Sequence, residues 1–153
     1  MTGDADERPI RVVAVGVVRR EGADGDELLV QRERDAAGEP FYRPPGGGVE
    51  FGEPSAEALR REFREEVGVE LAAVSYLDTY EDVFTHEGRT HHELWRCYEA
   101  EIAEDWPYER DSFAGYEPEL DERLDCVWKP IAELGPEDGE GETFYPGGIL
   151  SEL

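Results

Sequence analysis

The segment of residues 47–69, GGVEFGEPSAEALRREFREEVGV, constrains the fold of this chain more than any other feature. A glycine-rich loop leads to Pro54 and Ser55, which suit the first turn of a helix. Gly68 suits its end, because glycine readily adopts the left-handed conformation that terminates helices. Between these signals, apolar residues recur at helical spacing and predict a buried stripe. That stripe consists of Ala58, Leu59, Phe63 and Val67.

Three carboxylates lie along this helix at spacings that place them on one face. Glu62, Glu65 and Glu66 are related by i,i+3 and i,i+4. Like charges on adjacent turns repel one another, so folding alone does not favour them there. Mg²⁺ and Mn²⁺ prefer oxygen ligands and commonly bridge carboxylates to substrate phosphates. The segment therefore predicts a metal-diphosphate site that holds Mg²⁺, with Mn²⁺ as an alternative.

The same segment resembles the signature of the Nudix hydrolase family, of MutT-like type. That signature is Gly, five residues, Glu, seven residues, Arg-Glu, two residues of which the first is apolar, Glu-Glu, one residue, Gly and an apolar residue. A chance match at seven fixed positions is expected on the order of once in ten thousand chains of this composition. Phe63 stands where an aliphatic residue is more usual. The matching residues are Gly47, Glu53, Arg61, Glu62, Phe63, Glu65, Glu66, Gly68 and Val69.

The resemblance implies a fold of the α/β (α+β) class. It would be an α/β/α sandwich with a mixed sheet and a loop-helix-loop catalytic box, formed by residues 1–153 as one domain. Strands are predicted for residues 10–20, 27–32, 69–82, 91–103 and 126–129. Residues 106–122 read as an acidic, aromatic loop, residues 130–134 as a helical turn, and residues 145–153 as a C-terminal helix.

The resemblance also implies roles for individual residues. Arg61 would orient a box glutamate through a charge-assisted hydrogen bond. Glu53 would either touch a second metal ion or pair with Arg61. A backbone carbonyl of the glycine loop, at Gly46 or Gly47, would also contact the metal. The expected site comprises Glu53, Arg61, Glu62, Glu65 and Glu66 for catalysis, Gly46 with Glu62, Glu65 and Glu66 for metal, and Arg43, Gly47 and Gly48 for substrate.

The implied reaction is metal-dependent hydrolysis of a nucleoside diphosphate linked to another group. A nucleoside triphosphate, a nucleotide sugar and a capped RNA end are all open as substrates. The box does not identify the general base, and in so acidic a chain a surface charge is the simpler interpretation of each candidate. The candidates for the general base are Glu93, Glu117 and Glu119. A phosphate or nucleobase could be contacted by His86, His91 and His92. A nucleobase could stack on Trp95, Trp106 or Tyr116.

Two other functions remain open. One is a non-catalytic module of the same fold that senses a nucleotide, since the chain shows no substrate-specific signature after the box. The other is an isomerase of isoprenoid diphosphates, which needs a cysteine and a glutamate beside the substrate double bond. Cys97 and Glu93 fall on one face of the same predicted strand.

The charge balance limits the partners. The chain has 39 acidic and 15 basic residues, with a formal net charge of -24. Such a charge is unfavourable for binding nucleic acid, and it is typical of proteins adapted to concentrated internal salt, as in halophilic organisms. The longest apolar run, residues 12–18, is too short to cross a membrane. We therefore expect a cytoplasmic protein, which could form a homodimer, whose partner is a small phosphorylated nucleotide.

Overall fold

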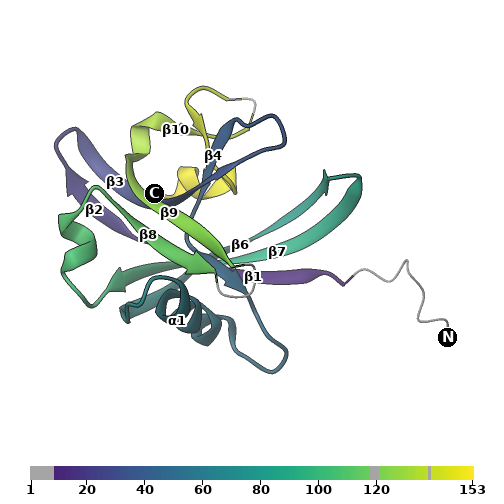
Figure 1. The fold of residues 1–153 in the computed structure, drawn as a ribbon, viewed down its shortest axis with the longest axis horizontal. Coiled ribbons are helices and arrows are strands. Elements are labelled where there is room, and N and C mark those ends of the chain that lie inside the picture. The colour runs from purple at the N-terminus through teal and green to yellow at the C-terminus, as the bar shows by residue number, and fades with distance from the viewer. Residues whose placement is uncertain (1–8, 118–120, 138) are drawn as a thin grey trace.

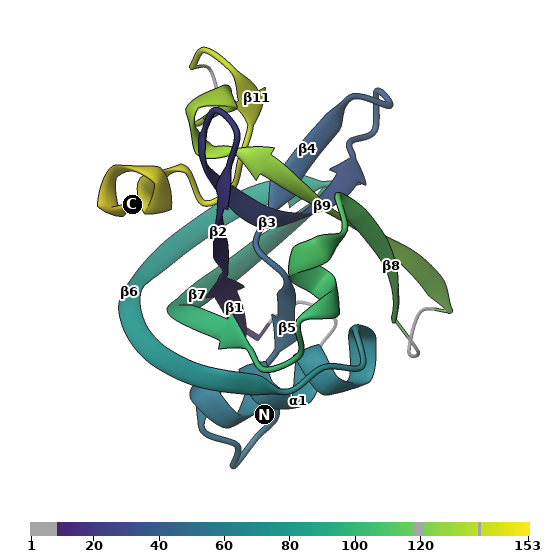
Figure 2. The same ribbon diagram turned by 90° about the vertical axis from the view of Figure 1, so that its left-hand side faces the viewer.

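The computed structural model describes residues 9–117, 121–137 and 139–153. Its first sheet has the order β5-β1-β7-β6. The pair β1–β7 is parallel and the pairs β1–β5 and β6–β7 are antiparallel, so this sheet is mixed, as the sequence predicted. In Figure 2, β6 curves around one side of the molecule. The strands are β1 (Arg11–Val17), β5 (Gly46–Gly48), β6 (Leu71–His86) and β7 (Arg89–Ile102).

The second sheet is antiparallel and has the order β2-β3-β9-β8, with β4 also paired to β3. Its long central strand β3 therefore borders both β4 and β9. A two-stranded parallel pair, β10–β11, lies beyond it. The strands are β2 (Arg19–Gly22), β3 (Gly25–Arg34), β4 (Pro40–Arg43), β8 (Ser112–Glu117), β9 (Glu122–Pro130), β10 (Leu134–Gly135) and β11 (Glu142–Thr143).

The helix α1 (Ser55–Glu66) lies along one side of the two sheets, as Figure 1 shows. Ala58, Leu59 and Phe63 are buried on its inner face, as the apolar spacing predicted. A Cβ atom on Gly16 of β1 would lie 3.2 Å from the Phe63 ring, so this glycine lets the aromatic side chain pack closely against the sheet. Gly68 ends the helix with a φ of 77° and donates to the carbonyls of Phe63 and Arg64.

Two apolar clusters form the core on opposite sides of the sheets. The cluster on the helix side includes Leu59, Phe63, Trp128 and Ile102. The other joins the opposite faces of β1 and β7 to β3, β9 and the C-terminal segment. Its fully buried members include Val13, Val15, Leu28, Val30, Cys97, Phe144 and Ile149. No helix within the described ranges is both long and apolar enough to cross a membrane.

Four expectations about the elements need correction. The predicted strand 10–20 divides at Val18, and its two parts, β1 and β2, join different sheets. Residues 106–122 are not simply a loop: they contain the 3-10 helix η1 (Trp106–Glu109) and strand β8. Strand β9 extends well beyond residues 126–129, because it pairs with both β3 and β8. The C-terminal helix is the 3-10 helix η3 (Gly147–Glu152).

The remaining elements agree with the prediction. The helical turn at residues 130–134 is the 3-10 helix η2 (Ile131–Glu133). Strands β6 and β7 form a hairpin with its turn at Glu87 and Gly88, although both strands are longer than expected. Pro54 occupies the N-cap position of α1 and Ser55 is its first residue, so both stand at the start of the helix as predicted, and the helix has no side-chain cap. The mixed α+β class is as expected.

Candidate active site

A cavity of about 1120 Å³ opens beside the glycine loop and the helix α1. Its walls come from both sheets and from the far end of the β6–β7 hairpin. Glycines of β5 and the acidic face of α1 form one wall, while β3, β4 and β7 supply others. Segments distant in sequence therefore meet at one site that is large enough to hold a small-molecule ligand.

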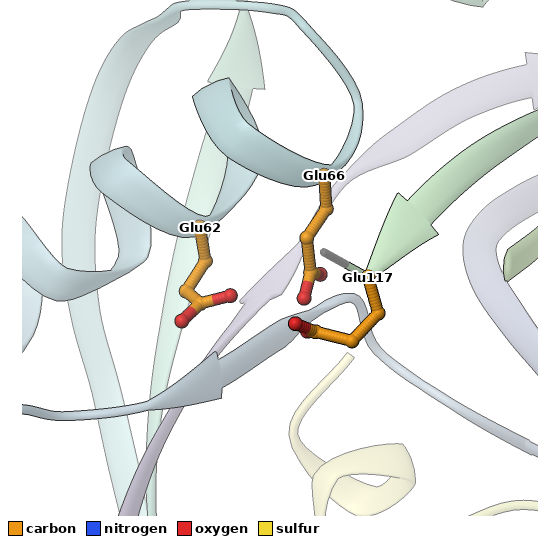
Figure 3. Close-up of side chains that lie close together, drawn as sticks. All are labelled: Glu62, Glu66 and Glu117. Carbon is orange, nitrogen blue, oxygen red and sulfur yellow. The ribbon is translucent and has the colours of Figure 1, made fainter. Parts of the chain in front are cut away.

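Three carboxylates converge at this cavity: Glu62, Glu66 and Glu117. One oxygen from each lies within 4.8 Å of the others. Glu62 and Glu66 extend from α1, and Glu117 reaches toward them from the end of β8, as Figure 3 shows. We call these residues the acidic cluster. Glu62 and Glu66 are only 8% and 7% exposed, so their charges are largely removed from water.

Burial and neighbouring carboxylates alter the ionisation of this cluster. The pKa of Glu66 is strongly raised, first by burial and then by its hydrogen bonds with Glu117 and Glu62. A carboxyl in such a setting holds a proton until a positive charge replaces it. A bound divalent cation reverses this effect, because it favours the ionised form of every ligand. Three hard oxygen donors suit Mg²⁺ or Mn²⁺ better than a metal that prefers nitrogen or sulfur.

Gly47 leaves the space that Glu62 occupies. A Cβ atom at this position would lie 2.5 Å from the Glu62 carboxylate. At Gly46 a Cβ atom would instead lie 2.0 Å from the backbone oxygen of Ala14, across the β1–β5 ladder. The glycine run thus serves two purposes: it lets β5 pair closely with β1, and it lets a helix carboxylate lie directly against the loop backbone.

Arg61 forms hydrogen bonds with several other residues of the box. Its guanidinium donates two hydrogen bonds to Glu53, at 2.8 and 3.0 Å, and one to the carbonyl of Gly48 at 3.0 Å. It also donates to Glu62 at 3.0 Å and to Glu65 at 3.2 Å. The carboxylate of Glu53 is the main cause of a raised Arg61 pKa. This geometry matches the expected orienting role, and it places Glu53 in the pair with Arg61.

The structure divides the predicted metal ligands. Glu62 and Glu66 belong to the acidic cluster, whereas Glu65 lines the cavity but is half exposed and bonded to Arg61. Glu117, which the sequence suggested only as a candidate base, is the third member of the cluster. No local pattern marks Glu117 among so many acidic residues, because only the β8–β9 pairing brings it to the helix.

The other candidates fall inside or outside the cavity. Glu93 lines it, is 8% exposed and accepts a hydrogen bond from Arg11 at 3.4 Å. Glu119 lies outside the described residues. Trp106 packs edge-on against Phe113 in the core. The cavity-lining candidates also include Arg43, His86, His91 and Trp95, whereas His92 bonds to Glu81 and Tyr116 to Asp121.

The two cysteines are separate and buried. Burial raises the pKa of each thiol to about 12. Cys97 is fully buried in the apolar cluster behind β7, although Glu93 on the same strand reaches the cavity. A cysteine placed in this way is unsuited to acid-base chemistry on a substrate, which argues against the isomerase alternative.

Comparison with known proteins agrees with this geometry. The family model of the NUDIX domain matches residues 10–146. The chain belongs to the Nudix family. This membership confirms the family expected from the box and, with it, the enzyme class, a hydrolase of phosphoric anhydride bonds.

Solved Nudix structures share the fold. A MutT NUDIX hydrolase from Burkholderia pseudomallei is similar with a TM-score of 0.63 and 22% identity, over 95% of this chain and 98% of that chain. A NUDIX hydrolase from Nitrosomonas europaea is similar with a TM-score of 0.55 and 21% identity, over 82% of this chain and 75% of that chain.

The similarity to a curated protein covers a limited region. An octanoyltransferase from Myxococcus xanthus is 36% identical over 66 residues, which are 43% of this chain and 18% of that protein. The chain therefore spans less than a fifth of the length of this relative.

Proposed function

We propose that the chain is a Mg²⁺-dependent pyrophosphohydrolase of nucleoside diphosphate derivatives, such as nucleoside triphosphates or nucleotide sugars. The observation that carries this proposal is the acidic cluster, in which Glu62, Glu66 and Glu117 converge within 4.8 Å at a large cavity. Three carboxylates this close repel one another when they are ionised, and a bound cation would relieve that repulsion. A small diphosphate is compatible with that overall charge because the cation supplies the local positive potential.

The residues of the site have distinct tasks in this proposal. Glu62, Glu66 and Glu117 hold the cation, and Arg61 fixes the carboxylate of Glu62 while Glu53 fixes Arg61. A cation held by these residues would supply charge neutralisation at the phosphate oxygens and activation of a water molecule for attack on phosphorus. Because Arg61 is held by Glu53 and the Gly48 carbonyl before substrate arrives, Glu62 needs little reorganisation on binding.

The alternative of a nucleotide-sensing module has less support. A sensor needs affinity but no ordered set of ligands around a reacting phosphate. Here Glu62, Glu66 and Arg61 are all present and connected, so the geometry favours catalysis.

The variant Glu117→Gln tests the proposal, because Glu117 belongs to the cluster but lies outside the Nudix box. We expect turnover of the best substrate in a panel of nucleoside triphosphates and nucleotide sugars, with Mg²⁺, to fall by about 100-fold or more. The matched control is Glu101→Gln, which removes an exposed carboxylate on β7. Full activity of Glu117→Gln would contradict the assigned role, and wild-type protein inactive on the whole panel would contradict the proposed reaction.

A further inference from the structure

Two buried polar atoms at the cavity have no hydrogen-bond partner in the described part of the chain: Oε1 of Gln31 and Nε1 of Trp95. Gln31 is 2% exposed and Trp95 is 6% exposed, and both residues line the cavity. Buried polar groups are nearly always paired in folded proteins, because an unpaired one loses its bonds to water without replacement. Two such atoms at the same cavity can therefore accept hydrogen bonds from, or donate them to, a bound ligand.

Two other buried side-chain atoms also form no hydrogen bond, but each of them lies beside an oppositely charged group. Nε of Arg43 lies 2.6 Å from a carboxylate oxygen of Glu33, and Oε2 of Glu142 lies 2.9 Å from Nζ of Lys129. Gln31 and Trp95 have no ion pair of this kind. A third comparison is Trp128, whose Nε1 is buried and donates to the carbonyl of Pro107 at 2.9 Å. The indole of Trp95 thus differs from an ordinary core tryptophan.

The strand register places these residues close to the acidic cluster. Gln31 of β3 lies opposite Cys126 of β9, and Gln31 and Glu66 line the same cavity. On the other side Gln31 lies opposite Arg43 of β4, whose guanidinium is 5.9 Å from the Trp95 ring centroid. Arg43 therefore links the two unpartnered side chains at one wall of the cavity.

The chemistry of the two side chains defines what they would recognise. The indole N–H of Trp95 can only donate, so it requires an acceptor. The amide of Gln31 accepts through its oxygen and requires an N–H donor. Nucleobases carry such donors and acceptors side by side on their edges, whereas inorganic phosphates and pyrophosphate offer no comparable apolar, amide-bearing edge.

We propose that Gln31 and Trp95 form a nucleobase-recognition subsite that selects nucleotides over base-free diphosphates. This proposal rests on the proposed function, since the diphosphate would lie at the acidic cluster. Both polar atoms are covered by protein atoms, so a side chain must move before a base can reach them. Arg43, which lies opposite Gln31 and 5.9 Å from the Trp95 ring centroid, would have to leave its ion pair with Glu33 in such a movement.

Variants of the subsite should bind nucleotides more weakly without becoming less stable. Trp95→Phe removes the indole N–H but keeps an aromatic ring, and Gln31→Met removes the amide but keeps a similar length. Each variant should weaken binding of at least one of ADP, GDP, UDP and CDP by about 10-fold or more, measured by calorimetry with Mg²⁺. Binding of inorganic pyrophosphate with Mg²⁺ should stay within about twofold of wild type. The melting temperature of the ligand-free protein should not fall, because each substitution removes a buried unpaired polar atom.

Trp128→Phe is the matched control. It removes an indole N–H that is already bonded, and leaves the Pro107 carbonyl unpaired. We expect its melting temperature to fall while its nucleotide affinity stays unchanged.

Three results would overturn the subsite. One is unchanged affinity of both variants for all four nucleotides. Another is a lower melting temperature of both variants together with equal loss of nucleotide and pyrophosphate binding, which would indicate a structural role. The third is wild-type protein that binds no nucleoside diphosphate more tightly than pyrophosphate. Because these are binding measurements, selective weakening in a protein without hydrolytic activity would support the subsite and contradict the proposed reaction.

Discussion

Replacing Glu66 by Gln should stabilise the metal-free protein while removing its response to Mg²⁺. Glu66 is 7% exposed and lies within 4.8 Å of Glu62 and Glu117. At about 5 Å and an effective dielectric constant near 20, two ionised carboxylates repel by about 3 kcal/mol. Glu66 lessens this repulsion by holding a proton, so only part of it is expressed at neutral pH. A neutral amide can also donate to its carboxylate neighbours, and we expect a net gain of about 1–3 kcal/mol in the free energy of unfolding.

The gain converts to a melting temperature higher by about 2–12 °C for a domain of this size. It should be measured in EDTA by thermal unfolding, and again with excess Mg²⁺. Wild-type protein at a Mg²⁺ concentration of 100 times Kd should gain about 2.7 kcal/mol from binding, and the variant should lose most of this gain.

The same variant has a predicted pH dependence. The folded-state pKa of Glu66 lies above its unfolded value of 4.5. Between these two values the folded protein binds more protons than the unfolded chain, so stability falls as pH rises through that window. Metal-free wild type should therefore lose stability between about pH 5.5 and 8, and Glu66→Gln should flatten this loss.

Glu57→Gln is the control for charge, because Glu57 lies exposed in the first turn of the same helix. It should leave the metal-free melting temperature and the Mg²⁺ response nearly unchanged. The reasoning is refuted if Glu66→Gln melts below wild type in EDTA, or if it keeps the full Mg²⁺-induced shift.

Three further predictions follow from the site and the charge. In Gly47→Ala the added Cβ would lie 2.5 Å from the Glu62 carboxylate and would displace that side chain rather than the backbone. We expect the variant to need more Mg²⁺ in a turnover assay and to keep a nearly unchanged melting temperature. An unaltered Mg²⁺ titration would contradict this. Arg61→Lys removes the planar guanidinium that donates to Glu53, Gly48 and Glu62. Urea unfolding should therefore show a free energy of unfolding lower by about 1–3 kcal/mol, and turnover should fall. Wild-type values of both quantities would show that the guanidinium is not needed. With a net charge of -24, stability should rise from 0.1 to 2 M KCl because salt screens repulsion between exposed charges, and a flat melting temperature over that range would exclude salt adaptation.

The sequence alone determined those features of the protein that depend on residues close together in the chain. Spacing within one helix predicted that Glu62 and Glu66 share a face, and that Ala58, Leu59 and Phe63 form the opposite, buried stripe. The resemblance of the box implied that Arg61 orients a glutamate and left Glu53 with two roles, a contact to a second metal ion or a pair with Arg61, and the structure shows the pair. These relations depend on helical geometry, which is fixed over short distances along the chain.

The tertiary structure decided what depends on strand pairing. Glu117 joins the acidic cluster because β8 pairs with β9, and residues 106–122 carry no period that announces a strand. Gln31 and Trp95 come from different sheets and meet one cavity only after both sheets have formed. Val18 separates two strands that a continuous apolar run predicted as one. Pairing partners far apart in sequence leave little local signal, since the same alternating residues can join many different strands.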